Sequence, residues 1–425
     1  MFVSRLALDD FRSWHRLVVD FSPGLNVLFG ANGLGKTNIV EAVEVLSTGS
    51  SHRVTSSMPL VLAGRPKATI RANVEDDGAT TLFEVSIPVR GANRARIDSG
   101  KSLYMRDVVG KVPSVTFSPE DQRLVSADPA GRRTFLNQAA SQLMPDYYDA
   151  LQRFNQTARQ RSALLRQLSQ RQTAGEPVDA ALSGLEIWTG QFIETGIALT
   201  RMRRHVVERL NGPFSRIYGE LAGEGQHARL TYAPSFDEVL HAGGDPSDAS
   251  DADAGDSDGI DADVDMQVHA AISRHFQRIY PGEVARAQNL IGPHRDDVIF
   301  ELNGMAARDY ASNGEMWTLA LALKMALFEL LRDVRGDEPL LILDDVFAQL
   351  DESRRRQIVD FARRQGQVLI TMAAATDMPD GLDAHRIDVG ALRDGIGGDG
   401  PDDGSIAIDG QMAALVAATA GKRNT

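Results

Sequence analysis

The chain has 425 residues, a formal net charge of −13 and no cysteine. This length exceeds one ordinary hydrophobic core, so two or more domains are expected. Without cysteine, a disulfide scaffold, a cysteine-ligated zinc site and thiol catalysis are excluded, and a reducing compartment is favoured. The opening sequence, MFVSRLALDD, has no apolar signal region, and no apolar run reaches the length of a membrane span. We therefore expect a cytoplasmic protein without membrane association.

The negative charge is concentrated in two segments. Residues 245–265 contain nine Asp and no Lys or Arg, and residues 378–410 contain eight Asp against two Arg. The remaining chain carries about +2, so the overall charge does not exclude nucleic acid as a ligand. Segments rich in Asp, Gly, Ser and Ala cannot bury a core. We expect a disordered acidic insertion at about 241–266 and a mostly disordered tail at 391–425.

The first part of the chain alternates in a pattern typical of a βα unit. Strands are expected at 3–8 and 17–21, followed by a loop and a helix that ends near residue 46. Further short strands are expected at 68–74, 82–89 and 115–117.

The loop, LFGANGLGKT at 28–37, follows an apolar strand and opens a helix, which is the context of a phosphate-binding loop. Backbone amides of such a loop and of the helix N-terminus cradle phosphates, while Lys36 neutralises their oxygens and Thr37 ligates magnesium. The loop therefore predicts a nucleoside triphosphate as ligand. The predicted contacts are Gly30, Ala31, Asn32, Gly33, Leu34, Gly35, Lys36 and Thr37.

The hydrophobic period changes at residue 147. Apolar residues at spacings of four and three predict two helices, from 147 to about 168 and from about 185 to 206, with a turn between them. Each helix would have roughly 25 residues and a length of about 37 Å. The pattern fits a coiled coil and a plain amphipathic bundle equally well.

The last part of the chain returns to an α/β pattern. A helix, a strand at 298–302 and a long helix from about 312 precede strands at 340–343 and 368–371. These strands supply the second half of a nucleotide-binding sheet, so we predict an α/β fold with one sheet split by a helical insertion. The expected domains are 1–125 (first half of the head), 126–285 (helical arm with the acidic insertion), 286–390 (second half of the head) and 391–425 (tail).

The sequence LLILDDVFAQLD, at 340–351, supplies the second half of the site. Asp344 ends an apolar strand, where a carboxylate can orient magnesium, and Asp345 follows, where a base could polarise attacking water. Lys36 and Asp344 are 308 residues apart, too far for a compact kinase or small GTPase. Lys36, Asp344 and Asp345 are the predicted catalytic residues, and Thr37 and Asp344 are the predicted metal ligands.

The sequence SNGEMWTLALALKMALFELL begins at Ser312 and allows two interpretations. Ser312 as N-cap and Glu315 three residues later form a capping box, worth about 1 kcal/mol. The same position, upstream of the second carboxylate motif, is where ATPases of the ABC superfamily present a signature loop to the γ-phosphate bound by the other subunit. Ser312, Gly314 and Glu315 are therefore candidate nucleotide contacts.

These motifs resemble, in order and over nearly the whole chain, the RecF family of bacterial recombinational repair ATPases, which is related to the SMC proteins. The acidic insertion and the tail fall outside the resemblance. The matching features are the phosphate loop, Phe11-Arg12, SPED at 118–121, Arg132-Arg133, IGPHRDD at 291–297, SNGE at 312–315 and LDDVFAQLD at 343–351.

The resemblance implies a P-loop ABC/SMC-type ATPase head that binds ATP and Mg²⁺ and dimerises on ATP. It also implies binding to single-stranded, gapped or junction DNA in repair, replication and the SOS response, with RecO and RecR as partners that help to load RecA. Asp344 would bind magnesium, Asp345 would stand where relatives place a catalytic Glu, Ser312 and Gly314 would act across the dimer, and Asp351 would connect the two sites.

Two departures from the wider ABC pattern predict slow hydrolysis, used as a switch. Asp345 reaches less far than Glu, and the strand at 368–371 leads into MAAATD without a His for the γ-phosphate. Asn313 stands where many signature loops carry Gln or Gly. The alternative function is another P-loop enzyme on the same head, either a nuclease or a small-molecule phosphotransferase.

Candidate DNA contacts form two basic groups that would bind the phosphate backbone in a salt-sensitive way without base readout. Each group can also be read as ordinary solvated surface, and no aromatic-interleaved patch predicts a stacking platform. Arg12 is a further candidate nucleotide contact, and His294 is expected to be a turn residue. The two groups are Arg90, Arg94, Arg96 and Lys101, and Arg153, Arg159, Arg161 and Arg166.

Overall fold

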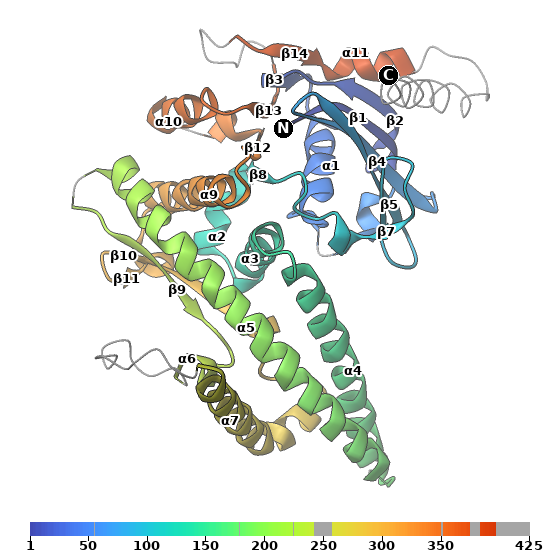
Figure 1. The fold of residues 1–425 in the computed structure, drawn as a ribbon, viewed down its shortest axis with the longest axis vertical. Helices are drawn as coiled ribbons and strands as arrows, with labels where there is room; N and C mark the ends of the chain where they lie inside the picture. The colour runs from blue at the N-terminus through green and yellow to red at the C-terminus, as the bar shows by residue number, and fades with distance from the viewer. Residues whose placement is uncertain are drawn as a thin grey trace.

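The computed structural model describes residues 1–54, 56–177, 179–223, 225–241, 257–349, 352–374 and 383–396. Two sheets lie at one end of the molecule, and two long helices extend from them to the other end (Figure 1). The described helices are α1 (Lys36–Thr48), α2 (Arg123–Ser126), α3 (Pro129–Leu143), α4 (Tyr147–Ala174), α5 (Asp179–Ala222), α6 (Glu238–His241), α7 (Ser257–Arg286), α8 (Ala307–Tyr310), α9 (Asn313–Arg335), α10 (Glu352–Ala362) and α11 (Val389–Ile396).

The first sheet is antiparallel and has six strands in the order β2-β1-β4-β5-β6-β7. The strands expected at 3–8, 17–21, 68–74 and 82–89 are confirmed as β1, β2, β4 and β5, whereas β6 and β7 were not predicted. The bounds are β1 (Phe2–Phe11), β2 (Trp14–Asp20), β4 (Lys67–Asp76), β5 (Ala79–Pro88), β6 (Arg94–Ile97) and β7 (Leu103–Tyr104).

The second sheet has five parallel strands in the order β14-β3-β13-β12-β8. Two come from the start of the chain and three from its end, and β13 pairs with both β3 and β12. The predicted sheet assembled from both halves of the chain is thereby confirmed. The bounds are β3 (Gly24–Phe29), β8 (Ser114–Phe117), β12 (Leu340–Asp344), β13 (Gln367–Met372) and β14 (His385–Asp388).

Both faces of the parallel sheet are buried, which explains its nearly continuous apolar strands. Leu340 and Ile342 pack in the cluster that contains α1 and the antiparallel sheet, whereas Leu341 and Leu343 pack in the cluster that contains α9. This division follows from the two-residue side-chain period of a strand. The helix that opens at the phosphate loop is therefore enclosed between two sheets.

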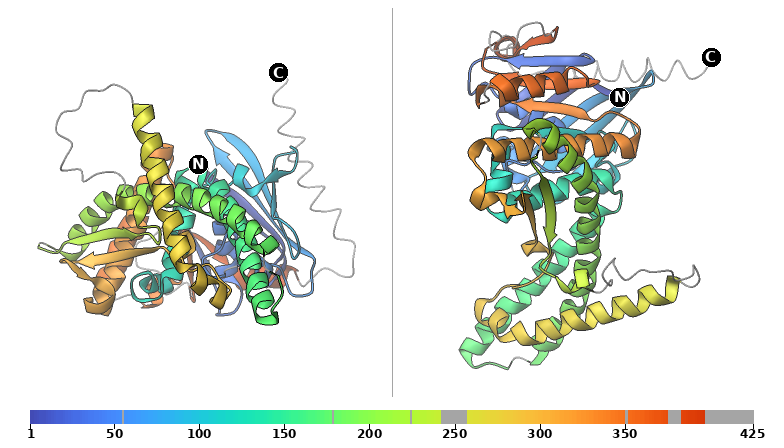
Figure 2. Two further views of the ribbon diagram at one scale, coloured as in Figure 1. Left: turned by 90° about the horizontal axis from the view of Figure 1, so that it is seen from below. Right: turned by 90° about the vertical axis from the view of Figure 1, so that its left-hand side faces the viewer.

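The helices α4 and α5 run antiparallel from the sheets to the far end, where α7 packs against both (Figure 2). α4 has 28 residues and α5 has 44. The predicted hairpin is confirmed, but its second helix is longer than expected. The expected acidic disordered insertion at 241–266 lies partly outside the described residues, and its last part is wrong because α7 already begins at Ser257.

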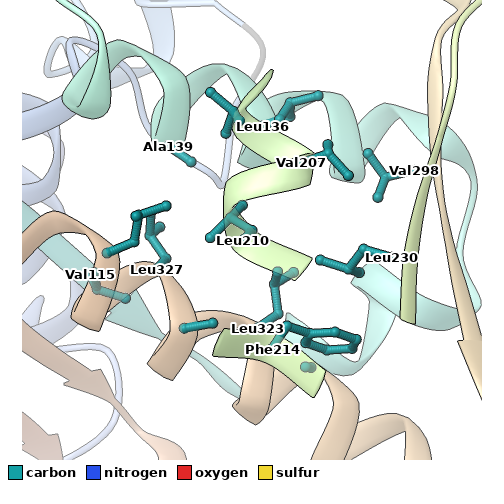
Figure 3. Packing of buried hydrophobic residues seen from close by; sticks show 14 of the residues in the cluster. Val115, Leu136, Ala139, Val207, Leu210, Phe214, Leu230, Val298, Leu323 and Leu327 are labelled. Atoms are coloured by element: carbon teal, nitrogen blue, oxygen red, sulfur yellow. The ribbon is translucent and has the colours of Figure 1, made fainter. Parts of the chain in front are cut away.

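The second half of α5 shares a core with the head (Figure 3). Val207 and Leu210 of α5 pack in one cluster with Leu136 of α3, Leu323 of α9 and Val298 of β10. A third sheet lies here, in the order β11-β10-β9. β9 and β10 pair across the expected boundary at residue 285. The domain limits stay predictions. The bounds are β9 (Ala228–Ala233), β10 (Asp297–Leu302) and β11 (Met305–Ala306).

The end of the expected head and the start of the expected tail are structured. Residues 385–396 form β14 and α11, and Ile387 and Val389 are buried in the cluster around α1. β14 pairs with β3 and so covers an edge that the strand next to the phosphate loop would otherwise expose. The expectation of disorder is therefore wrong for 391–396, and 397–425 lie outside the described residues.

Arg161 is the one charged residue that interrupts the apolar face of α4, and it is only 1% exposed. Its Nη1 and Nη2 donate to the two carboxylate oxygens of Glu283 on α7, at 2.9 and 2.6 Å. Nη1 also donates to Asn289 at 2.6 Å, and Nε donates to Thr189 of α5 at 2.9 Å. The suggestion that Arg161 contacts DNA is therefore wrong, because this guanidinium joins α4, α5 and α7 inside the arm.

We expect Arg161→Leu to lower the free energy of unfolding by about 3–5 kcal/mol, because Glu283 would remain buried without a cation. Urea denaturation would measure the change. Arg153→Leu is the matched control, since Arg153 lies on the same helix with an exposed side chain and should change stability by less than about 0.5 kcal/mol. Equal unfolding free energies for the two variants would contradict this role of Arg161.

Candidate functional site

The phosphate loop is fixed by the turn between β1 and β2. Gly35 is the N-cap of α1 and has φ +96°, a conformation that favours glycine. A Cβ on Gly35 would lie 2.8 Å from both Ser13 Oγ and Trp14 Nε1. The indole of Trp14 donates to the Gly35 carbonyl at 3.1 Å, and Asn38 donates to Ser13 at 2.8 Å. The turn therefore holds the loop at the point where the helix begins.

Lys36 is the first residue of α1 and is only 7% exposed. Its ammonium donates to the carbonyls of Gly30 and Ala31, at 2.6 and 3.0 Å. Burial lowers the pKa of Lys36, while the carboxylates of Asp345 and Asp344 oppose that shift. The other predicted contacts remain accessible to a ligand, since Asn32 and Gly33 are exposed and Leu34 is half-buried.

Thr37 and Asp344 meet although they belong to opposite ends of the chain. The Thr37 hydroxyl donates to Asp344 Oδ1 at 2.9 Å. Thr371, at the end of β13, donates to the same oxygen at 2.7 Å and accepts from the backbone N–H of Asp345 at 2.9 Å. Thr371 was missed by the sequence analysis, although a polar residue that ends a buried strand beside the carboxylate strand is a usable signal.

Asp345 has φ +53°, so the backbone turns sharply directly after β12. The negative charge of its carboxylate raises the pKa of the Lys36 ammonium more than the charge of Asp344 does. The structure therefore brings together Lys36, Thr37, Asp344 and Asp345. Asp351, expected to connect two sites, lies outside the described residues.

The ionised form of Asp344 is disfavoured by its surroundings. Burial raises the pKa of Asp344, and the hydrogen bonds from Thr371 and Thr37 oppose this shift without cancelling it. A carboxyl group whose pKa is higher in the folded state contributes most to stability at low pH, and that contribution is lost as pH rises through the folded pKa. At neutral pH the charge on Asp344 therefore destabilises the nucleotide-free protein.

We expect Asp344→Asn to raise the melting temperature of the nucleotide-free protein at neutral pH, with a gain that shrinks as pH falls toward about 4, the ordinary range of a carboxyl group. Differential scanning calorimetry over this pH range would measure it. Asp333→Asn is the control, because the Asp333 side chain is 69% exposed. A lower melting temperature for Asp344→Asn at neutral pH would contradict the sign of the effect.

The segment at 312–315 forms the predicted capping box. Ser312 Oγ accepts from the Glu315 N–H at 3.3 Å, and the Ser312 N–H donates to Glu315 Oε2 at 2.8 Å. The hydrogen bonds from Ser312 lower the pKa of Glu315. A Cβ on Gly314 would lie 2.6 Å from Arg354 Nη2. In the described part of the chain, Ser312 and Glu315 make no hydrogen bond to the phosphate loop, so the structure does not bring the two motifs together within one subunit.

Other matching motifs have structural partners. The guanidinium of Arg12 contacts Glu41 through Nε at 2.8 Å and through Nη2, so it is bound to α1. Arg132 of α3 donates to both carboxylate oxygens of Asp297, at 2.6 and 2.9 Å. Asp296 is fully buried and accepts from Arg203 of α5 at 2.8 Å. The motifs at 132–133 and 291–297 therefore tie the arm to the head.

His294 lies in a short 3-10 turn, η5 (Pro293–Arg295), as expected of a turn residue. Its Nε2 faces the Asn289 carbonyl at 3.2 Å, and burial lowers its pKa. Within the described ranges, no group of three or more His, Cys, Asp or Glu residues is placed to hold a metal ion. Among the helices that the structure describes, none is both long and apolar enough to cross a membrane.

The first basic group contains an aromatic contact that was not predicted. Arg94 and Tyr104 pair across β6 and β7, and the guanidinium carbon of Arg94 lies 4.1 Å from the ring centroid. Arg106 approaches the same ring at 4.8 Å. The sequence predicted no stacking platform, because Arg94 and Tyr104 are ten positions apart in the chain and only the strand pairing brings them together. In the second group, Arg153 forms an ion pair with Asp149.

The split parallel sheet, the phosphate loop that opens α1 and the carboxylate pair that ends β12 define a P-loop ATPase head of the ABC/SMC class. A family model described as the RecF/RecN/SMC N terminal domain matches residues 2–387. The chain belongs to the RecF family, which confirms the resemblance seen in the sequence.

Three relatives illustrate this membership. The DNA replication and repair protein RecF of Bifidobacterium longum subsp. infantis is 62% identical over 393 residues, or 92% of this chain and 90% of that protein. The protein of the same name from Bifidobacterium adolescentis is 60% identical over 430 residues, or 100% of this chain and 98% of that protein. The solved structure of the recombination mediator protein RecF-ATPrS in the RecFOR pathway has a TM-score of 0.74 at 25% identity, covering 92% of this chain and 96% of that one.

Proposed function

We propose that this protein is an ATP-dependent DNA-binding protein of recombinational repair and replication, which closes as a homodimer on single-stranded, gapped or junction DNA. The observation that carries the proposal is the convergence of Lys36, Thr37, Asp344 and Asp345 at one edge of the split sheet. The relatives support the biological setting, since two are named DNA replication and repair proteins and one is described as a recombination mediator in the RecFOR pathway. The RecFOR setting implies RecO and RecR as partners, and together these proteins would help to load RecA.

The donor set fits Mg²⁺, which prefers hard oxygen ligands. The Thr37 hydroxyl and the Asp344 carboxylate, already 2.9 Å apart, would hold the ion. A bound magnesium would neutralise phosphate charge. Lys36 would contact the phosphate oxygens, and Asp345 would orient the attacking water. Because Asp345 has a short side chain, we propose that hydrolysis is slow and serves to release DNA rather than to drive transport.

The dimer is proposed because a second nucleotide motif is exposed on another part of the same subunit. Ser312 and Asn313 are exposed and their neighbour Gly314 is half-buried, whereas the side chains that hold the phosphates are recessed. A nucleotide bound to one phosphate loop would therefore contact the N-terminus of α9 of a second copy, where backbone N–H groups favour an anion. ATP would therefore bridge the two heads, because each nucleotide would contact both subunits.

We expect wild-type protein to bind a labelled gapped DNA tightly only in ATP, with affinity that falls as salt rises. Lys36→Ala should remove this dependence on ATP, because the phosphates would lose their cation. Fluorescence anisotropy in ATP, in ADP and without nucleotide, at two salt concentrations, measures both properties. Equal weak binding of the wild-type protein in all three states would refute the DNA function and leave an ATPase with another substrate.

We expect Ser312→Arg to abolish dimerisation in ATP while retaining nucleotide binding, because a large cation would occupy the contact between subunits. Sedimentation velocity in saturating ATP, in an Asp345→Asn background that blocks turnover, would measure the oligomeric state. Ser312→Asn is the control, since Asn is an equally good N-cap. If Ser312→Arg still forms dimers, the motif serves only to cap α9.

A further inference from the structure

Two cavities lie on the arm side of the head and share one residue. The first has a volume of about 310 Å³ and lies between the C-terminus of α1, α3 and the first turns of α4. The second has a volume of about 430 Å³ and lies beside the middle of α4 and the turn at 293–295. Asn155 lines both. The two cavities are therefore adjoining parts of one surface.

One face of α4 runs through both cavities. We call this face the α4 stripe, and it consists of Tyr148, Gln152, Asn155, Arg159, Ser162 and Arg166. Their spacings of three and four residues place them on one side of the helix. Phe154, Arg161 and Leu165 are buried on a different side of the helix. From Tyr148 to Arg166 the stripe is about 27 Å long at 1.5 Å per residue.

The first cavity is polar but uncharged. The lining residues include Ser50, Asn137 and Gln152, which have hydroxyl or amide side chains, together with Tyr148. Asn137 Oδ1 already accepts from Tyr147 at 2.7 Å and from Arg203 at 2.9 Å, so its amide N–H groups remain for a ligand. Neutral donors and acceptors can form hydrogen bonds with the edge of a nucleobase, and an aromatic ring can stack on its face.

The second cavity is basic. Arg159, Arg166 and Arg295 line it, and among the described residues neither Arg159 nor Arg166 forms an ion pair. No described Asp or Glu lines either cavity, although the chain as a whole has a net charge of −13. The guanidinium groups of Arg159 and Arg166, which in the described part of the chain form no ion pair and face no lining carboxylate, favour phosphate as a ligand.

We propose that the α4 stripe binds single-stranded DNA, with an unpaired base in the first cavity and the adjoining backbone phosphates on Arg159, Arg166 and Arg295. A duplex does not satisfy this site, because its bases are paired and stacked. The stripe is long enough for the smallest single-strand sites, about four nucleotides. The inference rests on the proposed DNA function and assigns its strand preference to this chain's own residues.

The first test compares strands and needs no variant. Wild-type protein in ATP is titrated with a labelled single strand of thymidines, about 20 nucleotides long, and with a strand of the same length that has a sugar-phosphate backbone without bases. Loss of base contacts should weaken binding about tenfold. Equal affinity for the two strands would overturn the base site.

The second test removes the cations. We expect the double change Arg159→Ala and Arg166→Ala to weaken binding of the thymidine strand and to lower the slope of log affinity against log salt by about 1.4, or 0.7 per phosphate contact. Arg153→Ala is the matched control, because Arg153 lies on α4 outside both cavities and is paired with Asp149. Asn155→Asp should also weaken binding, since it places a negative charge between the cavities.

The outcomes separate this inference from the general function. ATP-dependent dimerisation should be unchanged in the double variant, which also shows that the protein is folded. An unchanged affinity and salt slope, or an equal loss in Arg153→Ala, would overturn the α4 stripe while leaving DNA binding in place. A wild-type protein that binds no DNA in any nucleotide state would instead refute the proposed function itself.

Discussion

The hydrogen bond between Thr37 and Asp344 sets the requirement on which the rest of the architecture depends. The two residues can meet only if β13 inserts between β3 and β12 in the observed register. Thr371, at the end of that central strand, donates to the same carboxylate. The ends of three short strands, β3, β13 and β12, thus form the site, and both faces of each strand must be buried. The antiparallel sheet covers one face and the cluster around α9 covers the other.

The arm is joined to this head by polar as well as apolar contacts. Asp296 and Asp297 follow one another in the chain but bind different partners, Arg203 of α5 and Arg132 of α3. Buried ion pairs are costly when either partner is lost and so define a single arrangement of the elements that carry them. The sequence motifs at 132–133 and 291–297 therefore determine how the arm leaves the head, while the nucleotide chemistry lies elsewhere.

The arginines of α4 show how far sequence patterns could be taken. Arg159, Arg161 and Arg166 look alike as a basic group, yet Arg161 is buried and the other two are exposed. Helical periodicity alone separates them, because Arg161 occupies the apolar face. The partners of Arg161, in contrast, could not be predicted, since Glu283 lies 122 residues away on α7. The contact between Arg94 and Tyr104 could not be predicted from the sequence either, because it depends on the pairing of β6 with β7.

The sequence by itself determined the phosphate loop, the carboxylate pair and the capping box, because each is encoded by neighbouring residues or by the period of a single element. The split sheet followed from two of these motifs, because the phosphate loop and the carboxylate pair must meet at one magnesium ion. The sequence did not predict the strand β14 at 385–388, which pairs with β3, and it indicated disorder at 391–396, because both stretches lie within the Asp-rich segment 378–410. Only the tertiary structure decided the role of Thr371, the partners of Arg161 and the meeting of two cavities at Asn155. These depend on contacts between segments far apart in the chain, where pairing and packing choose the partners and local pattern carries no information about them.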